Sequence, residues 1–277
     1  MRSQRLPADV PHPLGELLRG WRAHRGWSQL QLAGEVGVSQ RHLGFIEVGR
    51  SEPSRALVLG LARALDVPLR DRNALLLAAG YAPMYADPAW DADEMRMVRR
   101  ALDRLLRQHE PFPALVLDRH WNVLQANDAA PRLFGRFVDL AARPRPRNLL
   151  HLVFDPQGLR PHIANWPEVA RGLFERIARE AVGGVIDERL RALVEELRRY
   201  PGVDTGWQST EPTGGAGPVI PITFATGATR LSYFSLVSTV GTPTAAAAQE
   251  LRVECMFAAD EATEAWHGRQ GGESGSA

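Results

Sequence analysis

The stretch Ser28–Arg50, SQLQLAGEVGVSQRHLGFIEVGR, decides the fold of the first part of the chain, because it predicts two short helices joined by a tight turn. Ser28 and Ser39 are residue types that cap helix N-termini. Gly37 is suited to the left-handed backbone conformation that ends a helix. Apolar residues recur at helical spacing in both helices, namely Leu32, Ala33 and Val36, then Leu43 and Ile46. The small Ala33 allows a close helix crossing, which is the geometry of a helix-turn-helix.

The outward half of the second helix carries side chains that suit a recognition helix. The first turns of such a helix contact base edges in the major groove. Gln pairs with adenine and Arg with guanine through two hydrogen bonds, so Gln40 and Arg41 are the expected readers of sequence. His42 lies beside them, Phe45 would meet a thymine methyl, and Arg50 lies where a backbone phosphate would be met. The alternative is that residues 40–42 form an ordinary solvated face.

Composition limits the class of protein. A chain of 277 residues has enough material for two domains, and its single Cys excludes a disulfide framework and fits a cytoplasmic location. No apolar run is long enough to span a membrane, and the layout of a signal peptide is absent. Residues 1–80 hold 11 Arg against 7 acidic residues, a balance of +4, whereas residues 81–277 hold 22 Arg against 25, a balance of −3. The basic excess therefore accompanies the helix-turn-helix.

Three more helices complete a compact domain around this motif. A first helix is expected over Leu14–His24, a fourth from Pro53-Ser54 with Leu57, Leu61 and Leu65 as its core stripe, and a fifth that begins near Pro68 and ends at Gly80. We therefore expect a loose tail over residues 1–12 and a five-helix DNA-binding domain over residues 13–80.

These residues resemble the Cro/repressor type of helix-turn-helix, the XRE family. The resemblance implies an ion pair between Arg22 on the first helix and Glu47 at the end of the recognition helix, and phosphate contacts from Ser28 and Gln29. The family usually has Asn where this chain has Val48, which leaves Arg50 as the phosphate ligand there. The expected DNA-contacting residues are therefore Ser28, Gln29, Ser39, Gln40, Arg41, His42, Phe45 and Arg50.

A connecting region is expected over residues 81–108. Its first part holds three aromatic side chains, Tyr81, Tyr85 and Trp90, which favours packing on a domain over free flexibility. The second part, residues 93–108, predicts an amphipathic helix with Leu and Met on one side and Arg on the others. That helix either connects the domains or pairs with its copy in a dimer.

The remaining chain predicts an antiparallel sheet with covering helices. Short strands are expected over residues 114–117 and 122–125, followed by a helix over 128–134 that Asn127 caps. Helices over 166–180 and 187–200, a mobile loop over 201–217, a hairpin over 219–224 and 230–240, and a strand over 251–257 follow. This order resembles a PAS domain over residues 109–266, with a disordered tail over 267–277. Such a fold leaves a pocket between sheet and helices.

The second domain resembles the MmyB-like ligand-binding domain of XRE regulators, on the residues PALVLDRHWNVLQAN, NLLHLVFDPQGLRPHIANW, FSLVSTVGTP and ELRVECMFAADEAT. The resemblance implies a pocket for a small apolar ligand, with fatty acid as the favoured class. Candidate ligand-binding residues are Trp121, Phe134, Arg160, His162, Asn165, Trp166 and Phe234. A carboxylate head would pair with Arg160. The competing interpretation places Arg160 on the surface and makes Asn165 a helix cap.

No residue pattern predicts catalysis or a metal site. Cys255 has no matching His and acid, and it lies on the apolar side of its strand as a small core residue. The eight His show no metal-binding spacing. We therefore expect a dimeric, ligand-responsive regulator that binds double-stranded DNA, with no cofactor and no membrane partner. The alternatives are a constitutive dimeric repressor whose PAS-like domain only dimerises, and an enzyme or small-molecule carrier whose first domain is a tether.

Overall fold

The computed structural model describes residues 12–183, 187–203, 219–227 and 229–273, and the chain divides into two units. The first unit consists chiefly of the residues up to Asp87 and the second chiefly of those from Pro88 onward. The tail expected over residues 1–12 lies outside the described residues except for His12, which immediately precedes the first helix. The loop expected over residues 201–217 also lies outside them from residue 204 onward.

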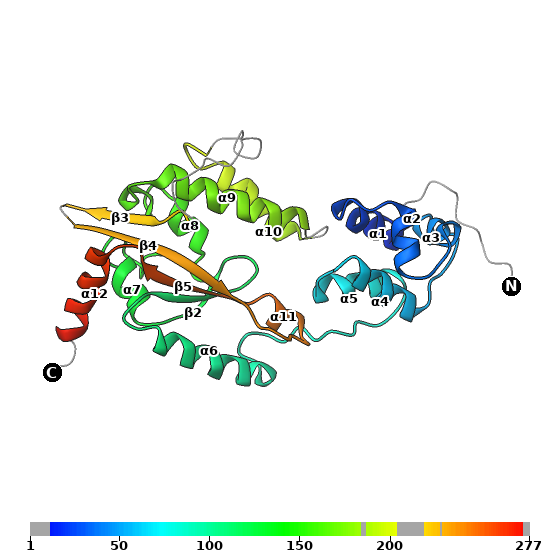
Figure 1. Ribbon diagram of the computed structural model, residues 1–277, viewed down its shortest axis with the longest axis horizontal. Helices are drawn as coiled ribbons and strands as arrows, with labels where there is room; N and C mark the ends of the chain where they lie inside the picture. Colours follow the sequence, from blue (N-terminus) through cyan, green and yellow to red (C-terminus); the bar gives the residue numbers. More distant parts are fainter. Residues whose placement is uncertain (1–11, 184–186, 204–218, 228, 274–277) are drawn as a thin grey trace. The chain divides into compact units, whose positions relative to one another are not determined.

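Five helices form the first unit (Figure 1), as the sequence predicts: α1 (Pro13–His24), α2 (Gln29–Glu35), α3 (Gln40–Glu47), α4 (Arg55–Ala64) and α5 (Leu69–Ala78). Their apolar faces enclose one core, in which Trp21, Leu32, Leu43 and Leu61 are almost completely buried. Leu57, which we expected in this core, is only half-buried, because the inward stripe of α4 passes through Val58.

The predicted caps of α2 and α3 are present. The Ser28 hydroxyl accepts from the Gln31 backbone N–H at 3.2 Å, and the Gln31 side chain accepts from the Ser28 backbone N–H at 2.8 Å, which is a capping box. The Ser39 hydroxyl accepts from the His42 N–H at 3.1 Å. Gly37 has φ +72°, the left-handed conformation that turns the chain from α2 into α3.

A five-stranded antiparallel sheet forms the second unit, with the spatial order β2-β1-β5-β4-β3. Its strands are β1 (Ala114–Leu117), β2 (Val123–Ala126), β3 (Ile222–Thr226), β4 (Thr229–Ser238) and β5 (Arg252–Ala258). Each begins and ends within a few residues of the expected bounds. The beginning and the end of the second unit therefore meet in the sheet, since β1 pairs with both β2 and β5.

The chain after Asp87 also forms helices, several of which cover this sheet (Figure 1). Those that the structure describes are η1 (Asp93–Met95), α6 (Arg96–Gln108), α7 (Ala129–Phe134), α8 (Leu149–Phe154), η2 (Arg160–His162), α9 (Trp166–Gly183), α10 (Glu188–Arg198), α11 (Ala246–Gln249) and α12 (Glu261–Glu273). The disordered tail that we expected from residue 267 onward is wrong, because α12 continues to Glu273 and His267 is buried. None of the described helices is long and apolar enough to cross a membrane.

The main core lies on one side of the sheet, beneath α8, α9 and α10, while α6 lies on the other side (Figure 1). Leu117, Tyr233 and Met256 face the helices of the main core. On the opposite side, α6 packs near β1, and Asn127 donates from Nδ2 to the Leu106 carbonyl oxygen at 3.4 Å. Strand β5 is therefore buried on both faces, and the core is not confined to the side that carries Cys255.

Candidate functional site

A buried ion pair joins α1 to the end of α3. Arg22 donates from Nε to Glu47 Oε1 at 2.9 Å and from Nη2 to Oε2 at 3.1 Å, and the Glu47 side chain is 0% exposed. This confirms the pair that the family resemblance implies. Gly15 is required beside it, because a Cβ there would lie 1.9 Å from the Glu47 carbonyl oxygen. Helix α1 therefore positions α3 from inside the fold.

The N-terminal half of α3 faces solvent. Gln40 and Arg41 are exposed, and His42 and Phe45 are half-buried. The Arg41 guanidinium lies over the Phe45 ring, 5.3 Å from its centroid, one helical turn further along. The exposed side of α3 thus offers an amide, a cation and an aromatic ring together, which are groups that can reach base edges.

The residues expected to contact phosphate differ in whether their side chains already have a hydrogen-bond partner. Gln29 donates from Nε2 to Glu47 Oε2 at 2.8 Å, so its side chain is held by the same buried carboxylate as Arg22. The Ser28 and Ser39 hydroxyls serve as caps. Arg50 is exposed, since Gly49 with φ +71° turns the chain outward after α3.

Three of the seven expected ligand residues meet in the core of the second unit. Trp121, Phe134 and Trp166 are all buried and belong to one apolar cluster. Phe134 lies 6.1 Å from the ring of Phe224 on β3. The Trp166 indole N–H donates to the Val153 carbonyl oxygen at 3.0 Å, which satisfies its polar atom inside the fold.

The loop before α9 holds the polar candidates, and two of them, Arg160 and Asn165, already have backbone partners. Arg160 stacks on Trp166, with its guanidinium carbon 3.8 Å from the ring centroid, and donates to the Pro201 carbonyl oxygen. Asn165 donates from Nδ2 to the Pro221 carbonyl oxygen at 2.7 Å and accepts from the Thr223 N–H at 3.0 Å. Asn165 therefore fastens the start of β3, a role that neither of our interpretations of this loop included.

Phe234 lies apart from the other ligand candidates. The β4–β5 register places it opposite Phe257, and the two rings stack 5.6 Å apart. Residues directly opposite each other in adjacent strands point to the same face, and the main core lies on the face of Tyr233 and Met256. The prediction that Phe234 lies in one pocket with Trp121 and Phe134 is therefore wrong.

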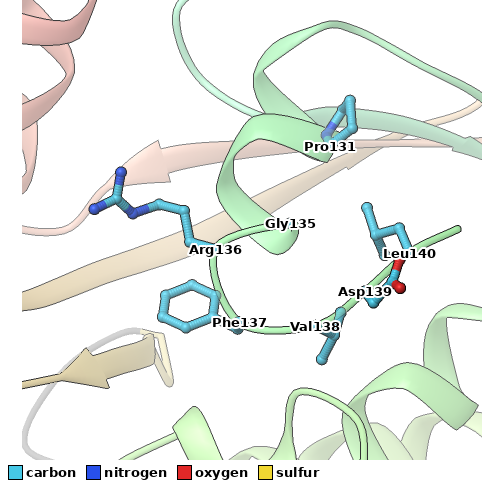
Figure 2. A pocket seen from close by; sticks show the side chains of 7 residues that line it. All are labelled: Pro131, Gly135, Arg136, Phe137, Val138, Asp139 and Leu140. Atoms are coloured by element: carbon cyan, nitrogen blue, oxygen red, sulfur yellow. The ribbon is translucent and has the colours of Figure 1, made fainter. Parts of the chain in front are cut away.

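An open hollow of about 620 Å³ lies beside this core, along the loop that follows α7. Figure 2 shows the side chains that line it, from Pro131 and Gly135 to Leu140. Its Phe137 stacks on Phe224, with centroids 5.2 Å apart, and lies 5.3 Å from the His162 ring. His162 therefore lies beside Phe137, which lines the hollow and which we did not single out from the sequence.

An ion network under α9 was also not predicted. Trp121, with φ +66°, has the Arg176 and Arg252 guanidinium carbons 4.5 and 5.2 Å from its ring centroid, and its indole N–H donates to Glu180 at 3.3 Å. Arg176 pairs with Glu254 at 2.9 Å, and Arg252 with Glu180 at 2.9 Å. One sequence signal was available, because Arg252 and Glu254 are two residues apart on a strand and so share a face.

The turn between β1 and β2 fastens the start of α10. Arg119 and His120 reach Asp187 at 2.7 and 3.1 Å, and Asp187 caps α10 through the Leu190 N–H. Burial raises the pKa of the Asp187 carboxyl, but these hydrogen bonds and the charge of Arg119 outweigh it, so the pKa lies well below its usual range. This cluster is a structural anchor between two parts of the second unit.

Comparisons with known proteins match both units. Residues 98–268 match the family model of the MmyB-like transcription regulator ligand binding domain, and residues 18–71 match that of the helix-turn-helix. The transcriptional regulator ClgR of Mycobacterium tuberculosis, from strains CDC 1551 / Oshkosh and ATCC 25618 / H37Rv, is 35% identical over 75 residues, which are 27% of this chain and 64% of ClgR. The chain thus spans a little under two thirds of these relatives. The descriptions of these families indicate a transcription regulator.

Two solved structures are also similar in part. The clp gene regulator ClgR from Corynebacterium glutamicum has a TM-score of 0.23 and 26% identity, and the match covers 38% of this chain and 99% of that one. An RNA-binding light-oxygen-voltage receptor has a TM-score of 0.24 and 12% identity, with 98% of this chain and 65% of that one covered.

Proposed function

Because this chain belongs to the family of transcription regulators that carry the MmyB-like ligand-binding domain, we propose that α3 reads a double-stranded DNA operator and that a small apolar ligand in the second unit alters this binding. In this proposal Gln40 and Arg41 read bases, with His42 and Phe45 beside them. Ser28, Gln29, Ser39 and Arg50 lie toward the phosphates.

The observation that carries the DNA proposal is the contrast between the two ends of α3. Its C-terminal end is fastened by Glu47, which is 0% exposed and bonded to both Arg22 and Gln29. Its N-terminal end exposes Gln40 and Arg41. A helix held rigidly from within can present two polar side chains in a constant direction, and such preorganisation is what base recognition through paired hydrogen bonds needs.

The ligand that we propose is an apolar molecule of the fatty-acid class. Support comes from the aromatic core around Phe134, Phe224 and Trp166 and from the adjoining hollow along Phe137. His162 lies next to this hollow, and Arg160 and Asn165 would contribute only after exchanging their present backbone partners. In this proposal an acid head group pairs with Arg160, the arginine of this loop.

We further propose a homodimer whose two α3 helices meet half-sites about one duplex turn apart. A ligand shifts operator affinity only if it binds one conformation of the dimer better than the other. The rival is a constitutive dimeric repressor whose second unit only dimerises. The filling of the core favours this rival, since Trp121, Phe154, Phe174 and Tyr233 are fully buried within one apolar cluster.

Two measurements on the full chain test the proposal. Selection from a random duplex library at low salt should yield a sequence with two related halves. Mass spectrometry of an organic extract of the purified protein should detect a stoichiometric long-chain acid. Failure to enrich any duplex would refute the DNA proposal. An empty extract, with no change in melting temperature on adding saturated fatty acids, would favour the dimeric repressor.

A further inference from the structure

Helix α6 has one face packed on the sheet and one face without a partner in the described structure. Leu102 and Leu106 are buried on the inward side. The outward side carries Arg100, Arg104 and Arg107 together with Met97, which is 80% exposed. At 100° per residue, these four side chains fall within one arc of the helix, and no acidic residue of α6 lies between them.

The cations of this helix differ in their partners. Arg99 is turned inward and donates to the Trp90 and Ala92 carbonyl oxygens. Arg107 pairs with Asp103. Arg100 and Arg104 are exposed, and within the described parts of the chain neither has an acidic side chain in ion-pair distance. Two adjacent turns of α6 therefore present two uncompensated positive charges to solvent.

We propose that the exposed face of α6 around Arg100 and Arg104 is a second DNA-binding surface, which contacts backbone phosphates outside the bases read by α3. This rests on the proposed operator binding by the first unit. The charge favours a polyanion over a second copy of α6, because two such faces would bring Arg against Arg. Arginine is also the side chain that binds phosphate oxygens through two hydrogen bonds.

Chain connectivity and spacing support the same partner. Residues 79–95 join α5 to α6, and 17 residues span at most about 60 Å when extended. A chain bound through α3 therefore keeps α6 within a few duplex turns of the operator. Arg100 and Arg104 lie about 6 Å apart along the helix axis, and each DNA strand carries one phosphate per about 3.4 Å of axis. The pair can thus meet neighbouring phosphates.

The test compares two duplexes in titrations with the full chain. The short duplex is the operator selected from a random library and trimmed to its preferred bases. The long duplex carries about 15 extra base pairs at each end, which is about one and a half turns of DNA. For the wild type, the slope of log K against log salt should be steeper on the longer duplex by about 1.8 per protomer, because two phosphates are neutralised. The double variant Arg100→Ala/Arg104→Ala should lose this difference and keep its binding to the short duplex.

Two controls separate charge from structure. The variant Arg100→Lys/Arg104→Lys should retain most of the slope, since it keeps the charge. The variant Arg189→Ala/Arg199→Ala removes two exposed arginines at α10 and should behave as the wild type. Equal salt slopes on both duplexes for the wild type would overturn this proposal alone. The same conclusion would follow if the alanine variant lost only dimerisation, or only binding to phosphatidylserine vesicles. A wild type that binds no duplex would overturn the operator proposal as well.

Discussion

Replacing Arg22 with Ala should destabilise the first unit by about 3–5 kcal/mol, because it leaves a buried carboxylate without its cation. The Glu47 side chain is 0% exposed, and without the guanidinium only the single hydrogen bond from Gln29 remains on its carboxylate. Arg22 also donates from Nη1 to the Trp27 carbonyl oxygen at 3.0 Å, which is lost in the same variant.

Hydrogen exchange measured by mass spectrometry on the full chain reports this loss locally, for peptides that cover α1 and α3. Their exchange should become about 10² to 10⁴ times faster, since 1.4 kcal/mol corresponds to a factor of ten. Peptides from β1 and β5 should not change and serve as an internal control. The double variant Arg22→Met/Glu47→Leu removes both charges and should recover most of the protection. A loss below about 1 kcal/mol for Arg22→Ala, the range of surface pairs, would refute this interpretation.

Gly15→Ala should destabilise the first unit by about 1–3 kcal/mol in the same exchange measurement, because the new Cβ meets the Glu47 carbonyl oxygen. Gly60→Ala, which meets nothing within 4 Å, should be neutral or stabilising, and equal effects of the two would contradict the crossing geometry. Arg50→Ala should weaken DNA binding evenly across sequences and lower the salt slope by about 0.9, and an unchanged slope would exclude a phosphate contact there. His267→Gln should flatten the pH dependence of α12 docking below about pH 6.5, and a slope equal to that of the wild type would contradict this.

The pH expectation for His267 follows from its surroundings. Burial lowers the pKa of its imidazole, which donates to the Pro111 carbonyl oxygen and accepts from the Tyr233 hydroxyl at 2.7 Å. The folded state therefore prefers the neutral ring, while the unfolded chain takes up a proton below about pH 6.5. The stabilisation is fully present above that pH and is lost as the pH falls through the lower pKa of the folded state. Burial also raises the pKa of the Tyr233 hydroxyl, so above about pH 10 the unfolded chain loses this proton while the folded chain keeps it, and the stabilisation falls as the pH rises further.

Local signals explain why the first unit could be predicted from its sequence. Ser28, Ser39 and Gly37 act on backbone groups within a few residues of themselves, so their roles can be recognised without knowing the tertiary structure. The Arg22–Glu47 pair joins residues far apart in the chain, and only the family resemblance indicated it.

In the second unit, local sequence signals did not decide which side chains come together. Strand β4 carries apolar side chains on both faces, so periodicity alone did not decide whether Phe234 or Tyr233 faces the main core. The pairing with β5 decides it. Asn165 was expected either to cap α9 or to bind a ligand, but its partners Pro221 and Thr223 are more than fifty residues away. Contacts of this kind depend on the topology of the sheet.

The most direct test of the central claim is base preference measured for the wild type and Arg41→Ala, with the full chain and a random duplex library at one salt concentration. Reading of bases by α3 predicts that Arg41→Ala relaxes the preference at one position of each half-site and weakens binding to the best sequence by about 1–3 kcal/mol. An unchanged preference at every position, or a wild type that enriches no sequence, would contradict it.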